Sequence, residues 1–278
     1  MLQLDYFSKH FSLKDRVIVI TGGSGLLGQQ HAEIVAFAGG VPIIIDLQKK
    51  AAEVLARRLR KKYGVNAVGY KVDITQECEI VENCERILNQ FGHIDGLVNN
   101  AANNPKVEGN SEKNFSRLEF FPIADWEADI AVGLTGAFLC SKHYGLAITH
   151  QGGSIVNISS DLGLISPDQR LYRKPELPDD QQPVKPITYS VVKSGLIGLT
   201  RYLATYWAEK GVRCNALCPG GIENNQDPAF LKEVCLRIPL GRLARADEYQ
   251  GVLLFLLSDA SSYMNGSIIS IDGGRTVW

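Results

Sequence analysis

Residues 16–28 carry the sequence RVIVITGGSGLLG, in which a run of β-branched apolar residues leads directly into a turn rich in glycine. A helical pattern follows through Phe37, and a second apolar run at 41–45 ends at Asp46. The order strand, tight turn, helix, strand within about 30 residues is the setting of a dinucleotide-binding turn. We therefore expect the rest of the chain to be built around this unit.

The glycine turn predicts a nucleotide site. Glycine lets the backbone approach a pyrophosphate, and the free N–H groups at the start of the following helix favour an anion. Asp46, at the end of the next strand, can accept both ribose hydroxyls and would repel a 2′-phosphate, so the sequence favours NAD over NADP as the cofactor. The residues expected to hold the cofactor here are Gly22, Ser24, Gly25, Leu26, Leu27 and Asp46.

Short apolar runs alternate with helical patterns along the remaining chain. This alternation predicts a single α/β domain over residues 1–278, with a Rossmann-type, doubly wound, seven-stranded parallel sheet and helices on both faces. The predicted strands are 16–20, 41–45, 67–72, 96–100, 153–159, 212–217 and 267–271. The predicted helices end near 37, 63, 91, 150, 210 and 258, and the fourth of them is a long helix over 126–150.

Composition limits the function classes. The net charge of −1 argues against a nucleic-acid partner. The longest fully apolar run, 252–257, is too short to span a membrane, and residues 1–14 lack the apolar core of a signal peptide. Six cysteines without a CxxC pair indicate reduced thiols and no metal site. We expect a cytoplasmic enzyme or binding protein that acts on a small molecule.

Two long segments, 103–122 and 161–187, follow predicted strands. In a parallel sheet such loops lie at the carboxyl edge, where ligands bind, so we expect active-site loops; the alternative is a surface insertion. The second segment contains five prolines together with Arg170 and Arg173. One hypothesis is that these arginines meet an anionic substrate, and the alternative is a solvated loop whose charges neutralise each other.

A Tyr and a Lys four residues apart share one face of a helix, and the chain contains two such pairs: Tyr189–Lys193 and Tyr206–Lys210. The Lys cation favours the phenolate, so it is expected to lower the pKa of the Tyr toward neutral and make it a usable acid or base. Because the spacing occurs twice, it does not identify a site by itself.

The ordered set of motifs resembles the short-chain dehydrogenase/reductase family, in its compact single-domain branch, over about residues 13–274. The resemblance selects Tyr189–Lys193 and leaves Tyr206 and Lys210 as packing and helix-end residues. It is carried by the glycine turn, Asp46, Asp73-Ile74, residues 99–102, Ser159-Ser160, Tyr189–Lys193, Pro219-Gly220 and residues 271–274.

The resemblance implies a role for each matching residue. Tyr189 would transfer a proton, Lys193 would tune it and bind the nicotinamide ribose, and Ser160 would hydrogen-bond the substrate oxygen. Asp73 and Ile74 would contact adenine, Asn100 and Ala101 the adenosine ribose, and Pro219, Gly220 and Ile222 the nicotinamide.

The chain departs from the family pattern at two places near this site. Gly133 stands where the family usually has an Asn that is thought to hold a water in the proton relay, so the relay must use another group or bulk water. The segment 161–187 also lengthens the interval between Ser160 and Tyr189. The stretch Tyr189–Trp207, together with the proline insertion, resembles members found with bacterial surface-polysaccharide genes.

The sequence as a whole predicts an NAD(H)-dependent oxidoreductase that interconverts a secondary alcohol and a ketone, with a sugar or sugar derivative as one substrate class. The resemblance implies a homodimer or homotetramer formed through the long helix and the Tyr189 helix. One alternative is a dinucleotide-binding sensor or assembly partner without catalysis, which Gly133 favours and the intact Ser160, Tyr189 and Lys193 oppose. A second is an epimerase or dehydratase that oxidises its substrate transiently.

Overall fold

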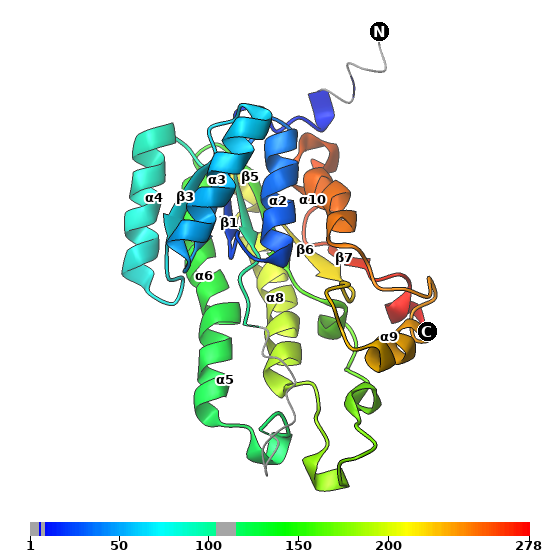
Figure 1. The fold of residues 1–278 in the computed structure, drawn as a ribbon. Coiled ribbons are helices and arrows are strands. Elements are labelled where there is room, and N and C mark those ends of the chain that lie inside the picture. Colours follow the sequence, from blue (N-terminus) through cyan, green and yellow to red (C-terminus); the bar gives the residue numbers. More distant parts are fainter. Residues whose placement is uncertain (1–5, 7–8, 104–114) are drawn as a thin grey trace.

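Seven strands form one parallel sheet in the spatial order β3-β2-β1-β4-β5-β6-β7 (Figure 1). The computed structural model describes residues 6, 9–103 and 115–278. Every residue of β1 is buried, as expected for a central parallel strand covered on both faces. The predicted Rossmann-type α/β fold is therefore confirmed. The strands are β1 (Val17–Thr21), β2 (Val41–Asp46), β3 (Val68–Lys71), β4 (Gly96–Asn99), β5 (Gly153–Ile158), β6 (Val212–Pro219) and β7 (Ile268–Ile271).

Helices pack on both faces of the sheet, and each face has its own apolar core. Side chains alternate along β1, so that Ile18 and Ile20 join the core on one face and Val17 and Val19 the core on the other. The first face is covered by α2 (Leu26–Phe37), α3 (Lys49–Tyr63) and α10 (Gln250–Leu257), and the second by α4 (Glu77–Phe91), α5 (Ile123–Ile130), α6 (Gly136–Cys140), α7 (Leu146–Ile148) and α8 (Ile187–Tyr206). Within the described parts of the chain, no helix is both long and apolar enough to cross a membrane.

The predicted long helix differs from the observed one in detail. It begins at Ile123, and two π-helical turns, Ala131–Thr135 and Ser141–Gly145, separate α5, α6 and α7. A search for a 3.6-residue period does not reveal such a turn, because a π-helical turn closes from residue i to i+5 over a single turn only.

One helix was not predicted, namely α9 (Pro228–Cys235). Its start carries local signals, since the Asp227 side chain accepts the N–H groups of Ala229 and Phe230 and a proline occupies the first turn. The helix packs on the 161–187 segment, where Leu171 joins Val234 in a small apolar cluster. The 161–187 segment therefore packs on the protein through apolar contacts. The alternative of a solvated loop is wrong for the buried part of this segment around Leu171. Residues 104–114 of the other predicted loop lie outside the described residues.

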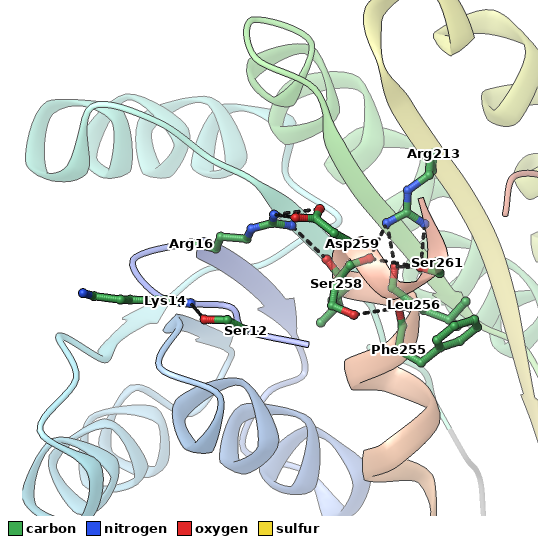
Figure 2. Close-up of polar contacts among 10 residues, drawn as sticks. Ser12, Lys14, Arg16, Arg213, Phe255, Leu256, Ser258, Asp259 and Ser261 are labelled. Atoms are coloured by element: carbon green, nitrogen blue, oxygen red, sulfur yellow. Dashed lines mark hydrogen bonds and ion pairs between the residues drawn. The ribbon is translucent and has the colours of Figure 1, made fainter. Parts of the chain in front are cut away.

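At the amino edge of the sheet, two arginines join elements that are distant in sequence (Figure 2). Arg16, just before β1, binds both carboxylate oxygens of Asp259 at 2.8 and 2.7 Å. Arg213, in β6, donates to the carbonyl oxygens of Leu256 and Ser258, each at 3.1 Å. These bonds fix the end of α10 against the starts of β1 and β6, at the edge opposite the glycine turn.

A glycine permits the close approach of the π-helical turn at 131–135 to α8. A Cβ placed on Gly133 would lie only 2.5 Å from Cγ1 of Val192. Val192 is 5% exposed, so it cannot move aside into solvent. The space that a side chain at 133 would need is therefore filled by Val192, and the two positions are complementary.

We predict that Gly133→Asn lowers the free energy of unfolding by about 1–3 kcal/mol, because overpacking a buried contact forces its neighbours to shift. Urea denaturation followed by circular dichroism measures this loss. In a Val192→Ala background the same substitution should cost clearly less. An equal cost in both backgrounds would show that Val192 does not fill the space.

Candidate active site

A cleft of about 430 Å³ opens at the carboxyl edge of the sheet, between the glycine turn and the start of α8. It brings the predicted site residues together with one exception, Ser24, which is not among the lining residues. Those that line it are Gly22, Gly25, Leu26, Leu27, Asp46, Asp73, Ile74, Asn100, Ala101, Ser160, Tyr189, Lys193, Pro219, Gly220 and Ile222. Their individual roles remain predictions.

The glycine turn needs glycine at two positions. Gly22 has a φ of +57°, and a Cβ there would lie 3.0 Å from Cα of Ala101. A Cβ on Gly28 would lie 2.2 Å from the carbonyl oxygen of Gly22. Asn100 then fastens the turn from β4, because its Nδ2 donates to the carbonyl oxygens of Thr21 and Gly22 at 2.9 and 3.1 Å. The Asn100 amide thus shapes the floor of the cleft.

Asp46 is held by the backbone at the end of β2. Its Oδ2 accepts the N–H of Ser24 at 3.1 Å, and its Oδ1 accepts the N–H of Gln48 at 3.0 Å. Ser24 therefore contributes through its backbone, by orienting Asp46. Each carboxylate oxygen retains acceptor capacity, so Asp46 can receive two hydroxyl donors from the cleft.

Ser160 lies at the other end of the cleft, at the start of a short chain of buried polar groups. Its Oγ donates to Oδ1 of Asp161 at 2.8 Å. Asp161 also accepts from Arg275 at 2.7 Å, and the side chains of this ion pair are only 3% and 11% exposed. Arg275 belongs to the C-terminal segment after β7. The pair keeps the Asp161 charge compensated beside Ser160.

The direction of the pKa shift at Tyr189 differs from expectation. Burial raises the pKa of the Tyr189 phenol above its usual value, the hydrogen bond with the Ser160 side chain lowers it, and the Asp161 charge raises it. Burial is the largest of these effects. For the chain without a cofactor, the expected lowering of the pKa of Tyr189 toward neutral is therefore wrong, because desolvation of the phenolate is the largest effect on it.

Lys193 is buried and is held away from the phenol ring. Its Nζ donates to the carbonyl oxygen of Ile158 at 2.8 Å and lies 5.8 Å from the centroid of the Tyr189 ring. Burial lowers the pKa of Lys193 to about 8, the Cys218 thiol raises it, and Lys185 lowers it. The Ser159 Oγ donates to the backbone carbonyl of Lys193 at 2.7 Å, which fixes α8 against the end of β5.

The second Tyr–Lys pair lies outside the cleft. Tyr206 is 63% exposed at the end of α8 and stacks on Tyr202, with ring centroids 5.5 Å apart. Tyr206 therefore packs against neighbouring aromatic rings at the protein surface, and it does not enter the cleft. Only the pair at Tyr189 is among the described lining residues of the cleft.

The two arginines of the 161–187 segment do not face the cleft. Arg170 pairs with Asp168 at 2.8 Å and Arg173 pairs with Asp179 at 3.3 Å, and both guanidinium side chains are largely exposed. These ion pairs match the self-neutralising alternative for the charged part of the segment. They give no support to substrate binding by either arginine.

Three charged residues next to the site were missed as site residues: Asp161, Lys185 and Arg275. Asp161 directly follows Ser160, and Lys185 lies four residues before Tyr189, so both carried a positional signal. No local pattern could connect Arg275 with Asp161, because the contact depends on where the chain leaves β7. Among the described residues, no three His, Cys, Asp or Glu side chains are arranged to hold a metal ion.

Comparison with known proteins agrees with this geometry. The family model described as short chain dehydrogenase matches residues 16–172, and the one described as Enoyl-(Acyl carrier protein) reductase matches residues 181–276. A 3-oxoacyl-[acyl-carrier-protein] reductase of Aquifex aeolicus is 34% identical over 94% of this chain and 98% of its own length. A cis-4-hydroxycyclohexanecarboxylate dehydrogenase of Sinomonas cyclohexanicum is 33% identical over 94% of this chain and 97% of its own length.

A solved structure shows the same fold. A gluconate 5-dehydrogenase from Burkholderia cenocepacia, in complex with NADP and tartrate, matches with a TM-score of 0.82 at 29% identity, over 98% of this chain and 99% of that one. The sequence matches and the fold similarity both extend over nearly the whole chain. The chain belongs to the short-chain dehydrogenase family, whose members are NAD(P)-dependent oxidoreductases that act on CH–OH groups.

Proposed function

We propose that this enzyme uses NAD(H) to interconvert a secondary alcohol and a ketone on a sugar or sugar derivative. The observation that carries the proposal is the placement of Ser160, Tyr189 and Lys193 at one end of a single cleft whose other end holds the glycine turn and Asp46. The glycine turn in the cleft lining supports dinucleotide binding, because Gly22 and Gly25 carry no side chain that would keep a pyrophosphate from the backbone.

The protein's part in the reaction is proton transfer and orientation. The nicotinamide, when bound, supplies or accepts the hydride. Tyr189 takes the proton of the alcohol in oxidation and returns it to the ketone oxygen in reduction. Ser160 holds the substrate oxygen by donating its hydroxyl proton. In the structure this proton is donated to Asp161, so a ketone oxygen competes with Asp161 for the Ser160 hydroxyl. Lys193 would hold the ribose of the cofactor.

The substrate class rests on two supports. The resemblance to members found with bacterial surface-polysaccharide genes favours a sugar derivative. Two relatives carry names of enzymes for hydroxylated acids, gluconate 5-dehydrogenase and cis-4-hydroxycyclohexanecarboxylate dehydrogenase. We therefore infer a polar substrate with several oxygen groups, in agreement with the polar side chains of Asn103 and Ser160 in the cleft lining.

We infer NAD rather than NADP from Asp46. The carboxylate lies in the cleft lining, fixed by two backbone N–H groups, and would repel a 2′-phosphate. The described lining residues around the end of β2 include no Arg or Lys that could bind such a phosphate. The Burkholderia relative was solved in complex with NADP, so the inferred preference for NAD rests on Asp46 of this chain alone.

We further propose a homodimer or homotetramer that assembles through α5–α7 and α8, in the cytoplasm. Large apolar side chains are exposed on these helices: Phe138 at 50%, Leu146 at 57% and Tyr202 at 62%. Their apolar area would be buried by a second copy of the same helices. The cytoplasmic location is supported by the six cysteines, all of which are free thiols.

Tyr189→Phe is expected to reduce kcat by a factor of at least about 10² while cofactor binding is kept, because only the transferred proton is lost. The measurement is NAD reduction with gluconate, cis-4-hydroxycyclohexanecarboxylate, free sugars and simple secondary alcohols, together with calorimetric titration of NAD. Tyr206→Phe is the matched control and should leave both unchanged. A Tyr189→Phe enzyme with full turnover would refute the proposal, and a chain that binds NAD but oxidises none of these alcohols would support the sensor alternative.

Asp46→Asn is expected to reduce the NAD-over-NADP ratio of kcat/KM by about tenfold, or about 1.4 kcal/mol, because the repulsion of the 2′-phosphate is lost. Initial rates with both cofactors give this ratio. Asp73→Asn removes another carboxylate of the cleft lining and should leave the ratio unchanged. A wild-type enzyme that prefers NADP would contradict the assignment.

Light scattering of the purified chain should give the mass of a dimer or tetramer. The double substitution of Phe138→Glu and Tyr202→Glu should lower that mass, since it places charges in the proposed interface. Tyr263→Glu, on a fully exposed aromatic residue outside these helices, is the control. A wild-type chain that is monomeric at all concentrations would exclude the assembly.

A further inference from the structure

A lysine outside the Tyr–Lys motif lies nearer to the Tyr189 ring than the lysine of the motif does. The Nζ atom of Lys185 is 3.9 Å from the ring centroid, whereas the Nζ of Lys193 is 5.8 Å away. A cation at this distance over an aromatic ring is attracted to the ring, and it is attracted more strongly when the ring carries the negative charge of a phenolate.

The backbone holds Lys185 in this place. Its N–H donates to Oε1 of Gln169 at 2.8 Å, and the N–H of Val184 donates to Oγ of Ser116 at 3.0 Å. Pro186 then begins α8 and fixes the direction in which the chain enters the helix. The end of the segment is therefore tied to an earlier part of the same segment through Gln169 and to the chain before α5 through Ser116, and these ties hold the backbone of Lys185 in place.

The phenolate of Tyr189 needs a cation beyond Lys193. Burial and the charge of Asp161 both raise the pKa of Tyr189, which opposes its use as a base near neutral pH. Lys193 donates to the carbonyl oxygen of Ile158 and is the more distant of the two lysines from the ring. Of the two lysines, Lys185 has its Nζ nearer to the centroid of the Tyr189 ring.

We propose that Lys185 is a positioning residue for proton transfer: a second cation that, together with Lys193, stabilises the phenolate of Tyr189. The proposal rests on the proposed function, since it concerns the same tyrosine. It also explains why the 161–187 segment returns to the cleft directly before α8. The segment supplies a charge that the usual Tyr–Lys motif does not contain.

The charged and titratable groups around Tyr189 come from four parts of the fold. Lys193 lies on α8, Asp129 lies on α5, and Asp161, Tyr172 and Lys185 lie on the 161–187 segment. Arg275, from the C-terminal segment, pairs with Asp161, and Thr188 donates to Asp129. Both carboxylates therefore have a partner, which leaves the two lysines as the groups that favour a phenolate.

The Lys185 side chain is positively charged at neutral pH, where Tyr189 would act as a base. Burial lowers the pKa of Lys185 to about 8, while Asp161 and Asp129 raise it. Below about pH 8 the side chain is mainly an ammonium, and above it the stabilisation of the phenolate is lost. The effect would be measured with NAD⁺ bound, because a positive nicotinamide beside the phenol would favour the phenolate and lower the pKa of Tyr189.

The experiment measures the ionisation of Tyr189 in the enzyme saturated with NAD⁺. Phenolate absorbance is titrated in the wild type and in Tyr189→Phe, and their difference isolates this tyrosine. The same difference is measured in Lys185→Met and Lys185→Arg backgrounds. Lys185→Met is expected to raise the pKa of Tyr189 by about one unit, as for the loss of a unit charge a few Å away in a partly buried site. Lys185→Arg should keep it near the wild-type value.

The pH dependence of kcat/KM reports the ionisation of the same side chain, Tyr189. In alcohol oxidation, the acidic limb of the pH profile of kcat/KM should move to higher pH in Lys185→Met, by the same amount, and return in Lys185→Arg. Arg173→Met, which removes an exposed cation from the same segment, is the control for net charge and should shift nothing. If Lys185→Met does not fold, as judged from NAD⁺ affinity, Lys185→Gln replaces it.

An unchanged pKa of Tyr189 in a folded Lys185→Met or Lys185→Gln enzyme would overturn the proposal, as would a shift that Lys185→Arg does not reverse. These results are distinct from a failure of the proposed function. In that case the wild type itself would bind no NAD⁺ or would show no ionisation that depends on Tyr189.

Discussion

The close approach of three backbone segments at the glycine turn is the constraint on which the cleft depends. Gly28, at the start of α2, lies against the carbonyl group of Gly22, and Gly22 lies against Ala101 after β4. A side chain at either glycine would push these segments apart, so α2 could not begin where it does. Asn100 adds two hydrogen bonds that tie β4 to the turn. The floor of the cleft, the position of Asp46 and the order of the central strands all follow from this contact.

At the opposite end of the cleft, burial and nearby charges determine how readily Tyr189 ionises. Burial disfavours the phenolate of Tyr189, and the Asp161 carboxylate next to Ser160 disfavours it further. Arg275 compensates Asp161, and the two lysines on either side of the ring supply the positive charge. The chain keeps the Ser–Tyr–Lys set of its family but changes the surroundings. Val192 fills the space beside Gly133, and an inserted segment brings Lys185 to the tyrosine.

Local patterns predicted most of the fold and the cofactor end of the cleft. Buried strands, the glycine turn and Asp46 are visible in sequence because each depends on neighbours a few residues away. The charged end was predicted less well. The pair of Asp161 and Arg275 joins positions 114 residues apart, and burial of Tyr189, which reverses the direction of its pKa shift, exists only in the folded chain. Lys185 has the spacing of a helical neighbour, yet Pro186 places it outside the helix, so no periodicity indicated its contact with the ring.

If Ser160 and Tyr189 hold the alcohol beside a bound nicotinamide, a hydride would pass directly from the carbinol carbon to the cofactor. An alcohol substrate that carries deuterium on its carbinol carbon, followed by mass spectrometry of the reduced cofactor, measures this transfer. Direct transfer between groups held in one cleft predicts that the deuterium is recovered in NADH and that the oxidation is slowed by the label. Deuterium released into water, or returned to the substrate without net NADH formation, would contradict the account.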